Sequence, residues 1–512
     1  MIDFQLSPEQ LAMRNAVRGF ARANLQTARS IYEAQRASSS AWEDRFRSTQ
    51  PIYAEAVKAG LIKAQVPKQL GGAGGPLIEA ALVVEEFYAV ETSASLTILG
   101  TGLGLTPLIM SGSPEHSKFF KPFLDGTGTP LASLVFSEPG GSANFAEAGA
   151  SGFETVAQLQ GEEYIINGEK VSDLRFCSFE LVTDRMQIWA TNCSGWDDRG
   201  ADVQCVLCRV EGSAAVDDVR GQTAIIIVTR QDIAKNDASA YSVLSHPETI
   251  GHTAVNGPHI RFKNLRVPRS NLLAPPGKGA DLVEMTFTAS AALVGAMGVG
   301  IMRQTFDRVL AWAKENRRGS KEAMIQKQSV ADLLIKIKTR CEATRALVWK
   351  AACCFGSTRF GAELCYEAKI FGSESAVECV MDAINLVGVS AYSRTQPFGD
   401  LLNDAVVLPI FDGGNVGVRR RQVEAIFAQD AVYKMPKAVK GALLQCDPPQ
   451  MAMVRKIDRE SNNAYIIEEI DDHTCLVKET KVEEIKARVK ELMDAAMGMD
   501  EDDNDDKDSD LD

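Results

Sequence analysis

The chain has 512 residues, of which 45% are hydrophobic, so it can bury a large core and should hold more than one domain. Much of its formal net charge of −13 lies at one end, because residues 500–512 contain nine acids and one lysine. That composition is too charged to fold, and we expect a disordered acidic tail over 497–512. No concentrated basic patch indicates direct nucleic-acid binding.

The cysteines and apolar runs bear on compartment and metal binding. No uninterrupted apolar run approaches about 18 residues, so we expect neither a membrane span nor a signal peptide. Eleven cysteines are scattered without framework spacing, which suggests a reducing intracellular compartment. Cys205 and Cys208 form a C-x-x-C inside an apolar run. A buried strand is favoured there over zinc or redox chemistry because no second ligand pair accompanies them, and we predict no metal site.

Residues 1–128 have the periodicity of helices. Ser7 and Gln10 form a predicted capping box before the first of them. Residues 129–272 then have the pattern of a β domain, and residues 273–429 return to long helices. The strand candidates are LASLVFS (131–137), FETVAQLQ (153–160), EYIINGEK (163–170) with an Asn-Gly turn, DVQCVLCRV (202–210), TAIIIVTR (223–230) and HIRFKNLRV (259–267). This order predicts a multidomain fold, with helices around a small β-barrel.

Two glycine-rich stretches, GTGLG (100–104) and GAMGVG (295–300), lie inside helical patterns. Neither follows a strand, so we interpret them as positions of close helix packing rather than as a dinucleotide-binding loop.

Residues 435–496 form a separate small α/β unit. The pattern predicts a strand, a helix, two strands joined at IDDH and a closing helix, whose apolar stripe contains Val482, Ile485, Val489 and Leu492. A unit of about 60 residues is near the lower limit for independent stability, so we expect it to need a partner.

The stretch LPIFDGGN (408–415) ends an apolar run with Asp412. Burying an unpaired carboxylate is costly, so such a residue either faces solvent or serves a purpose. The simpler interpretation is a turn, in which Asp and Gly supply capping and positive φ. The next residues have a helical pattern, in which consecutive side chains point about 100° apart. At most one of Arg419, Arg420 and Arg421 can therefore face Asp412.

Several motifs together resemble the acyl-CoA dehydrogenase family of flavoproteins, most closely its nitroalkane oxidase branch, over residues 1–429. LVFSEPGGSAN (134–144) resembles the flavin-contacting strand and loop, which implies that Phe136, Ser137 and Ser142 lie along the FAD ring. IWATN (188–192) resembles the family's Trp-x-Thr-Asn element, which places Trp189 and Thr191 beside the flavin.

The same resemblance implies sites for the rest of the cofactor. Arg318 and Gln328, ten residues apart, have the spacing of the family's Arg and Gln that contact the FAD pyrophosphate of a neighbouring subunit. Gly388 lies in the segment NLVGVSAY, which corresponds to the family's glycine-rich pyrophosphate segment. Later glycines of that segment are replaced, which weakens the match there. The remaining predicted cofactor-binding residues are Lys327, Gly413 and Gly414.

The resemblance also implies a reaction. Asp412 stands where acyl-CoA dehydrogenases have a catalytic glutamate, and it is expected to abstract the α-proton of a neutral primary nitroalkane. Arg419 is expected to hold Asp412 ionised, because a nearby cation lowers a carboxyl pKa. Ser290 matches a serine that hydrogen-bonds this base; the alternative is a helical serine bonded to its own backbone. The implied products of nitroalkane, O2 and water are an aldehyde, nitrite and H2O2. Acyl-CoA dehydrogenation is the alternative, and a cytoplasmic homotetramer is expected.

Residues 435–496 are similar to the smallest subunit of the transcription and DNA-repair factor TFIIH. That likeness implies a non-enzymatic module that pairs with a larger TFIIH core subunit in the nucleus, in transcription initiation and nucleotide excision repair. Cys446, Asp471, Asp472 and His473 lack the paired spacing of a zinc site. A chain that functions only as this subunit, with an inactive oxidase region, remains an alternative.

The sequence departs from both families in two places. Residues 171–187 interrupt the expected NGEKIWATN, and they are either a retained intron or a genuine surface loop. Met435 stands where the small subunit would begin alone, so two adjacent genes could be read as one. The insertion lies beside the predicted flavin strand, which puts FAD binding by this chain in question.

Overall fold

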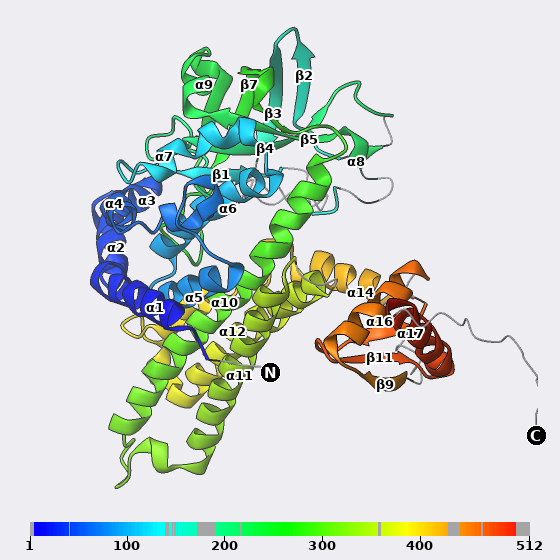
Figure 1. Cartoon of the computed structure of the whole chain (residues 1–512). Coiled ribbons are helices and arrows are strands. Elements are labelled where there is room, and N and C mark those ends of the chain that lie inside the picture. Colours follow the sequence, from blue (N-terminus) through cyan, green and yellow to red (C-terminus); the bar gives the residue numbers. More distant parts are fainter. Residues whose placement is uncertain are drawn as a thin grey trace, which may run out of the picture. The chain divides into compact units, whose positions relative to one another are not determined.

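The protein is described from a computed structural model over residues 5–39, 41–138, 143–145, 147, 150, 152–170, 190–215, 218–356, 360–428, 441–461 and 464–497. The chain divides into two compact units, Met1–Ile426 and Phe427–Asp512, and each is described by itself (Figure 1). The predicted insertion at 171–187, Met435 and the acidic residues 498–512 lie outside the described residues.

The first unit opens with helices, as predicted. Ser7 caps the first of them, since its hydroxyl accepts from the Gln10 backbone N–H while the Gln10 side chain accepts from the Ser7 backbone N–H, which confirms the capping box. The helices are α1 (Pro8–Phe20), α2 (Ala28–Ser38), α3 (Glu43–Ser48), α4 (Gln50–Lys58), α5 (Leu77–Tyr88), α6 (Ser93–Ser111) and α7 (Lys121–Leu124).

An eight-stranded sheet follows, interrupted by the short helices α8 (Val219–Gln222) and α9 (Arg230–Ala234). Its order is β6-β7-β3-β2-β4-β5-β8, and β1 pairs in parallel with β4. All six predicted strand regions form strands, and the short β6 and β8 were not predicted. The strands are β1 (Ala132–Val135), β2 (Val156–Gln160), β3 (Glu163–Lys170), β4 (Val203–Val210), β5 (Thr223–Thr229), β6 (Tyr241–Ser245), β7 (His259–Pro268) and β8 (Leu272–Ala274).

The Asn-Gly turn predicted in EYIINGEK is wrong. Asn167 and Gly168 lie inside β3, where the pairing with β7 shifts register between Ile166 and Gly168. Gly168 has φ +148°, and a Cβ there would lie 2.6 Å from the backbone Cα of Thr155. The glycine therefore marks a strand irregularity and a close backbone approach, not a reversal of the chain.

The C-x-x-C pair lies in a buried strand, as predicted. Cys205 and Cys208 are both fully buried in β4. Side chains three apart on a strand point to opposite faces. Cys205 accordingly packs in the core between the sheet and the first helices, whereas Cys208 packs in the core on the other face. The two thiols cannot bind one metal ion.

Long helices complete the first unit: α10 (Gly279–Glu315), α11 (Gln328–Cys354), α12 (Gly361–Val387), α13 (Phe398–Ala405) and α14 (Arg420–Ala428). Figure 1 shows α10, α11 and α12 as neighbouring long helices, and they contact one another extensively. A Cβ at Gly298 of α10 would lie 2.5 Å from the Gly372 carbonyl oxygen of α12, and one at Gly104 of α6 would lie 2.3 Å from the Ser133 nitrogen of β1. The close-packing interpretation of both glycine stretches is confirmed.

Two of these helices, α6 and α10, are long and apolar enough to cross a membrane by length and composition. The sequence did not predict them as candidate membrane spans, because polar residues interrupt the apolar run of each helix. Their most apolar stretches are 67% and 78% buried within the structure, which is the pattern of core helices.

The second unit has the predicted element order: β9 (Gly441–Gln445), α16 (Pro448–Glu460), β10 (Ile466–Glu469), β11 (Thr474–Lys478) and α17 (Val482–Met497). The sheet order is β10-β11-β9 with antiparallel pairs. Ile485 is fully buried, and the other predicted stripe residues of α17 pack against the same small core. The Asp458 carboxylate accepts from the backbone N–H groups of Tyr465 and Ile466, which joins α16 to the start of β10.

Candidate active site

Asp412 lies in the loop between α13 and a π-helical turn, η9 (Asn415–Arg419). Its φ is +54° and that of Gly413 is +77°, so both residues are left-handed. Such strain at a non-glycine residue persists only where the surroundings impose it, as at functional sites. The Asn415 N–H closes the loop by donating to the Pro409 carbonyl at 2.9 Å. Although its backbone is partly accessible, the side chain of Asp412 is only 5% exposed.

Ser290 of α10 contacts both oxygens of this carboxylate. Its Oγ lies 2.8 Å from Oδ1 and 2.9 Å from Oδ2 of Asp412. The same hydroxyl is 3.2 Å from the Phe287 carbonyl, which is the backbone contact of the alternative interpretation. A hydroxyl has one proton to donate, and a carboxylate takes the shorter, stronger bond. The arrangement favours Ser290 as the donor to Asp412.

Arg419 holds the backbone of the base. Its Nη2 and Nε donate to the Asp412 carbonyl oxygen at 2.6 and 3.2 Å, whereas its Nη2 lies 3.8 Å from the nearer carboxylate oxygen. The guanidinium also lies over the Tyr366 ring, 4.9 Å from its centroid. As predicted, only one of the three arginines faces Asp412, since Arg420 pairs with Glu374 and Arg421 with Glu147.

Burial raises the pKa of Asp412 above the ordinary value for an aspartate. The positive charges of Arg419 and Lys369 and the hydrogen bond from Ser290 act in the opposite direction. The expectation that Arg419 offsets desolvation is therefore met only in part, because the buried carboxylate loses more hydration than these groups return. A carboxylate with a raised pKa is a stronger base when it is ionised.

Lys369 was not identified from the sequence. It lies on α12, fully buried, and its Nζ donates to Asn415 Oδ1 at 2.8 Å. Burial lowers its pKa to about 8, while the nearby Asp412 charge raises it. Within a long helix a lone lysine has the pattern of a solvent-facing residue. The inward position of Lys369 is evident only from the fold, in which it contacts Asn415, 46 positions later in the chain.

The predicted flavin strand leads to this site. Phe136 follows β1, and its ring lies edge-on to Phe287 with centroids 5.0 Å apart. Phe287 is the residue whose carbonyl is contacted by Ser290 and Arg419. Ser137 is the next residue along the chain, half-buried. Ser142 and Trp189 lie outside the described residues.

Thr191, Gly413 and Gly414 are three further predicted cofactor contacts. Thr191 is half-buried beside α6, where a Cβ on Gly100 would lie 2.8 Å from its methyl group. Gly413 and Gly414 shape the loop: a Cβ at Gly413 would lie 2.9 Å from the Arg419 guanidinium, and the Gly414 carbonyl accepts from the Arg419 N–H.

Arg318 and Gly388 meet within one chain, although 70 positions separate them. The Arg318 guanidinium donates to the carbonyls of Leu386 and Val387 at the end of α12. Gly388 follows with φ +67°, and a Cβ there would lie 2.5 Å from Arg318 Nη2. Lys327 and Gln328 instead make surface contacts, with Glu322 and Asp332 respectively.

These residues fit FAD at two points. Because Gly388 has no side chain, the Arg318 guanidinium can lie against its backbone, and this cation suits an anionic diphosphate. Phe136, directly after β1, leads through Phe287 toward the buried carboxylate, where a flavin ring would need to lie. Among the described residues, no group of three or more His, Cys, Asp or Glu side chains could hold a metal ion.

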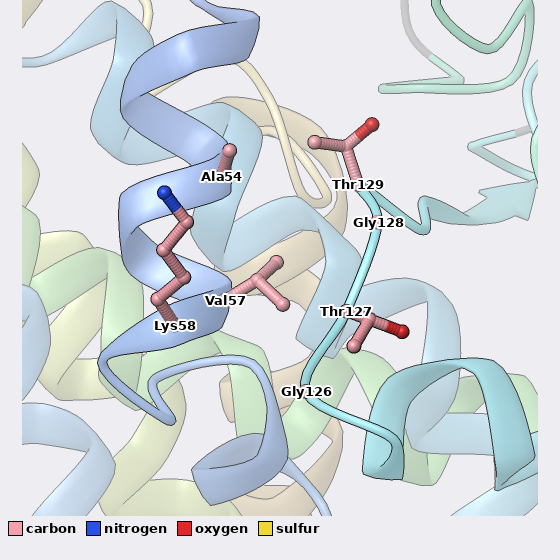
Figure 2. A pocket seen from close by; sticks show the side chains of 7 residues that line it. All are labelled: Ala54, Val57, Lys58, Gly126, Thr127, Gly128 and Thr129. Atoms are coloured by element: carbon pink, nitrogen blue, oxygen red, sulfur yellow. The ribbon is translucent and has the colours of Figure 1, made fainter.

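A separate hollow of about 440 Å³ lies between α4 and residues 126–129 (Figure 2). Val57 points from α4 toward this loop, whereas the Thr127 hydroxyl points away from the helix. Lys58 is its charged lining residue and pairs with Glu55. None of the site residues lines it, so the buried carboxylate, rather than this hollow, marks the chemistry.

Comparison with known proteins decides the family. Residues 7–127 match the profile described as acyl-CoA dehydrogenase, N-terminal domain, and residues 277–426 match the C-terminal domain. Nitroalkane oxidase of Podospora anserina is 49% identical over 431 residues, or 83% of this chain and 96% of that protein. Nitroalkane oxidase of Fusarium oxysporum is 43% identical, over 86% of this chain and its whole length. The chain belongs to the acyl-CoA dehydrogenase family. It is a flavin oxidoreductase that uses FAD.

Solved structures extend the family likeness to three dimensions. The Podospora anserina nitroalkane oxidase structure is 48% identical, with a TM-score of 0.79, over 84% of this chain and 98% of that one. Three further nitroalkane oxidase structures are 41 or 42% identical over 84 or 85% of this chain and 97 or 98% of theirs, with TM-scores of 0.77 or 0.78. One is an active-site Asp-to-Asn mutant with 1-nitrooctane, one a Ser-to-Ala mutant with 1-nitrohexane, and one concerns the roles of an arginine and that aspartate.

Outside the acyl-CoA dehydrogenase family region, residues 435–498 match the profile described as transcription factor TFIIH complex subunit Tfb5.

Proposed function

We propose that the first unit is a nitroalkane oxidase, which converts a neutral primary nitroalkane, O2 and water to an aldehyde, nitrite and H2O2. The observation that carries this proposal is the buried Asp412 carboxylate, held by Ser290 and by Arg419 seven residues later. Aspartate and serine are altered in active-site mutants of the solved nitroalkane oxidases, and an arginine seven residues after that aspartate was analysed for its role in their reaction. Asp412 and Arg419 have the same spacing.

In this proposal Asp412 takes the α-proton of the substrate onto a carboxylate oxygen. Its small exposed fraction limits competition from water, and the left-handed loop fixes where the carboxylate points. Ser290 donates to the ionised form, and Arg419 fixes the loop while its charge lies near the same carboxylate. Bound FAD would accept the electrons that the substrate loses and pass them to O2.

The test compares neutral nitroethane with its preformed anion, ethyl nitronate. The full chain and the same chain lacking residues 171–187 are each assayed for bound flavin, nitrite release and O2 uptake. Asp412→Asn should keep the flavin but lose at least about 100-fold in turnover of nitroethane, because an amide is no base. It should retain turnover of the nitronate, which has no proton left to remove.

The control is acyl-CoA, the substrate class of the parent family. Turnover of acyl-CoA without nitrite release from nitroethane would assign the chain to that activity instead. Near-normal turnover of neutral nitroethane by Asp412→Asn would show that another group is the base. If the full chain contains no flavin but the variant lacking residues 171–187 binds it, the loss of flavin binding is due to residues 171–187.

We propose that the oxidase unit assembles as a homotetramer, as the family resemblance implies. Val389 and Tyr392 lie on the short helix η8 (Gly388–Tyr392), 89% and 93% exposed. Large apolar side chains so exposed are typical of surfaces that a partner covers. Their place directly after Gly388 supports a cofactor site close to a subunit interface.

For residues 435–496 we propose a non-enzymatic role as a partner of a larger TFIIH subunit in the nucleus. The small sheet supports this role, because β9 and β10 are its edge strands and it exposes large apolar side chains. Leu443 of β9 is 62% exposed and Ile470, after β10, is 55% exposed. Edge strands with exposed apolar neighbours favour pairing with another chain.

Co-expression of the full chain with the larger TFIIH core subunit tests this role. Leu443→Glu should weaken co-purification at least about tenfold, because the charge must be buried on pairing. Gln445→Glu, two residues along the same face of β9, places the same charge on an already polar position and serves as the control. Failure of the unsubstituted chain to co-purify with that subunit would contradict the proposal.

A further inference from the structure

Lys369 is a charged group in the core of the helical bundle. The side chain has no exposed surface, and its ammonium donates to Asn415 Oδ1 at 2.8 Å. A buried ammonium is costly unless an opposite charge and hydrogen bonds compensate for the lost water. An apolar residue would cost less at this helix position, so the lysine requires an explanation outside packing.

The ammonium fixes the orientation of a side-chain amide. An ammonium can only donate, so the Asn415 oxygen must face Lys369 and its NH2 must face the other way. That NH2 group donates to Ser373 Oγ at 2.9 Å and Glu374 Oε1 at 3.1 Å, both on α12. The backbone of Asn415 meanwhile donates to the Pro409 carbonyl. Helix α12 thus holds the far end of the loop that carries Asp412.

The charges around Lys369 single out one partner. The ionised groups that act on it are Asp412, Arg419 and Glu374. Glu374 is partly exposed and already pairs with Arg420, and Arg419 repels the ammonium. Asp412 is the buried anion of the set, so the charges of two buried cations act on one buried carboxylate.

We propose that Lys369 is a positioning residue for the base: through Asn415 it fixes the loop of Asp412, and its charge favours the ionised carboxylate. This inference rests on the proposed function of Asp412 as the base. It goes beyond that function because it assigns a role to a group on α12 that does not contact the carboxylate by hydrogen bond.

The test uses the flavin-loaded protein and the variants Lys369→Met and Lys369→Gln. Lys336→Met, which removes a half-exposed lysine paired with Asp382, is the matched control for loss of one positive charge. The infrared carboxylate band that disappears in Asp412→Asn identifies the base, and its intensity is followed against pH. The acidic limb of kcat/KM for nitroethane is measured in parallel.

Removal of the Lys369 charge should move the Asp412 titration midpoint upward by about one pH unit, because a nearby cation favours the charged form. The acidic limb of kcat/KM should move in the same direction, so that activity below the midpoint falls about tenfold. Lys336→Met should leave both unchanged. A purely structural role would lower flavin content or stability without moving the midpoint.

Two outcomes overturn the proposal: an unchanged midpoint in a folded, flavin-containing Lys369→Met protein, or an equal shift in Lys336→Met. If Lys369→Met does not fold, Lys369→Gln keeps a donor for Asn415 without the charge, and the same midpoint decides. The infrared titration needs no substrate. A lack of nitroalkane turnover would therefore defeat the proposed function while the titration still decides the role of Lys369.

Discussion

At the residue scale, the site combines a strained backbone with a buried charge. Asp412 adopts a left-handed conformation and its carboxylate is almost wholly removed from water. Arg419 contributes most directly through its backbone contact, because two N–H groups of its rigid guanidinium donate to the carbonyl oxygen of Asp412. A lysine could not reproduce this geometry. The surrounding contacts therefore hold a conformation and a charge that the loop alone would not favour.

Asp412→Asn should stabilise the folded protein near neutral pH. The folded pKa of Asp412 is raised, so the folded state holds this proton more tightly than the unfolded chain does. Its contribution to stability is fully present below the unfolded pKa and is lost as pH rises through the folded pKa. The amide mimics the protonated form and avoids that loss.

Thermal unfolding of the two proteins checks this prediction. The melting temperature of Asp412→Asn should exceed that of the unsubstituted chain at pH 7–8, and the difference should shrink as pH falls toward about 4. A variant that is less stable at pH 7 would show that the charge of Asp412 contributes net stability to its two buried cations.

Sequence patterns predicted this site unequally. Helical geometry predicted that at most one of the three arginines faces Asp412. Burial cost singled out Asp412 as unusual, but the residues alone favoured a turn there, and its role as the base came from the family resemblance. Lys369 was not predicted, because a lysine in a helix predicts a solvent-facing position unless the packing of the opposing loop is known. Ser290 was placed by family resemblance, since a helical serine has the same local pattern whether or not it meets a carboxylate.

At the element scale, long and strongly patterned segments were predictable and irregular ones were not. The helices and the apolar strands have distinct periodicities. The three-residue β8 is too short to show one, and β6, with the sequence YSVLS, does not alternate strictly between apolar and polar residues. Asn167-Gly168 has the composition of a turn, but the pairing of β3 with β2 and β7 keeps it within a strand. Tertiary pairing there overrides the local preference.

Close contact between α10 and α12 predicts a specific sensitivity to added volume. Gly298→Ala would place a methyl group 2.5 Å from the Gly372 carbonyl oxygen, which cannot move independently of its helix. We expect a loss of about 1–3 kcal/mol in unfolding free energy, against a propensity gain of at most about 1 kcal/mol. Calorimetric melting temperatures would measure the difference.

Gly19→Ala is the control for that substitution. Gly19 lies in α1, and a Cβ there meets nothing within 4 Å, so the helix propensity gain should act alone. Equal melting temperatures for Gly298→Ala and Gly19→Ala would show that α10 and α12 separate at little cost.

At the scale of the whole molecule, the chain joins a flavin oxidoreductase to a small module with its own core. The proposed assembly of the first unit predicts that Tyr392→Glu lowers the mass measured by light scattering, because a charge would be placed in the covered interface. Flavin content should fall with it, since Arg318 and Gly388 lie beside the same short helix. An unchanged mass would remove Tyr392 from the interface.

The left-handed backbone at Asp412 also limits which acidic residue can occupy this position. Positive φ is tolerated by aspartate and asparagine more readily than by longer side chains. Asp412→Glu, which would introduce the acid that the family resemblance implies for acyl-CoA dehydrogenases, adds a methylene to a residue held at φ +54° in a packed site. Asp412→Glu is therefore expected to move the carboxylate away from its present position unless the loop geometry changes with it, so exchange of the two acids would require more than one substitution.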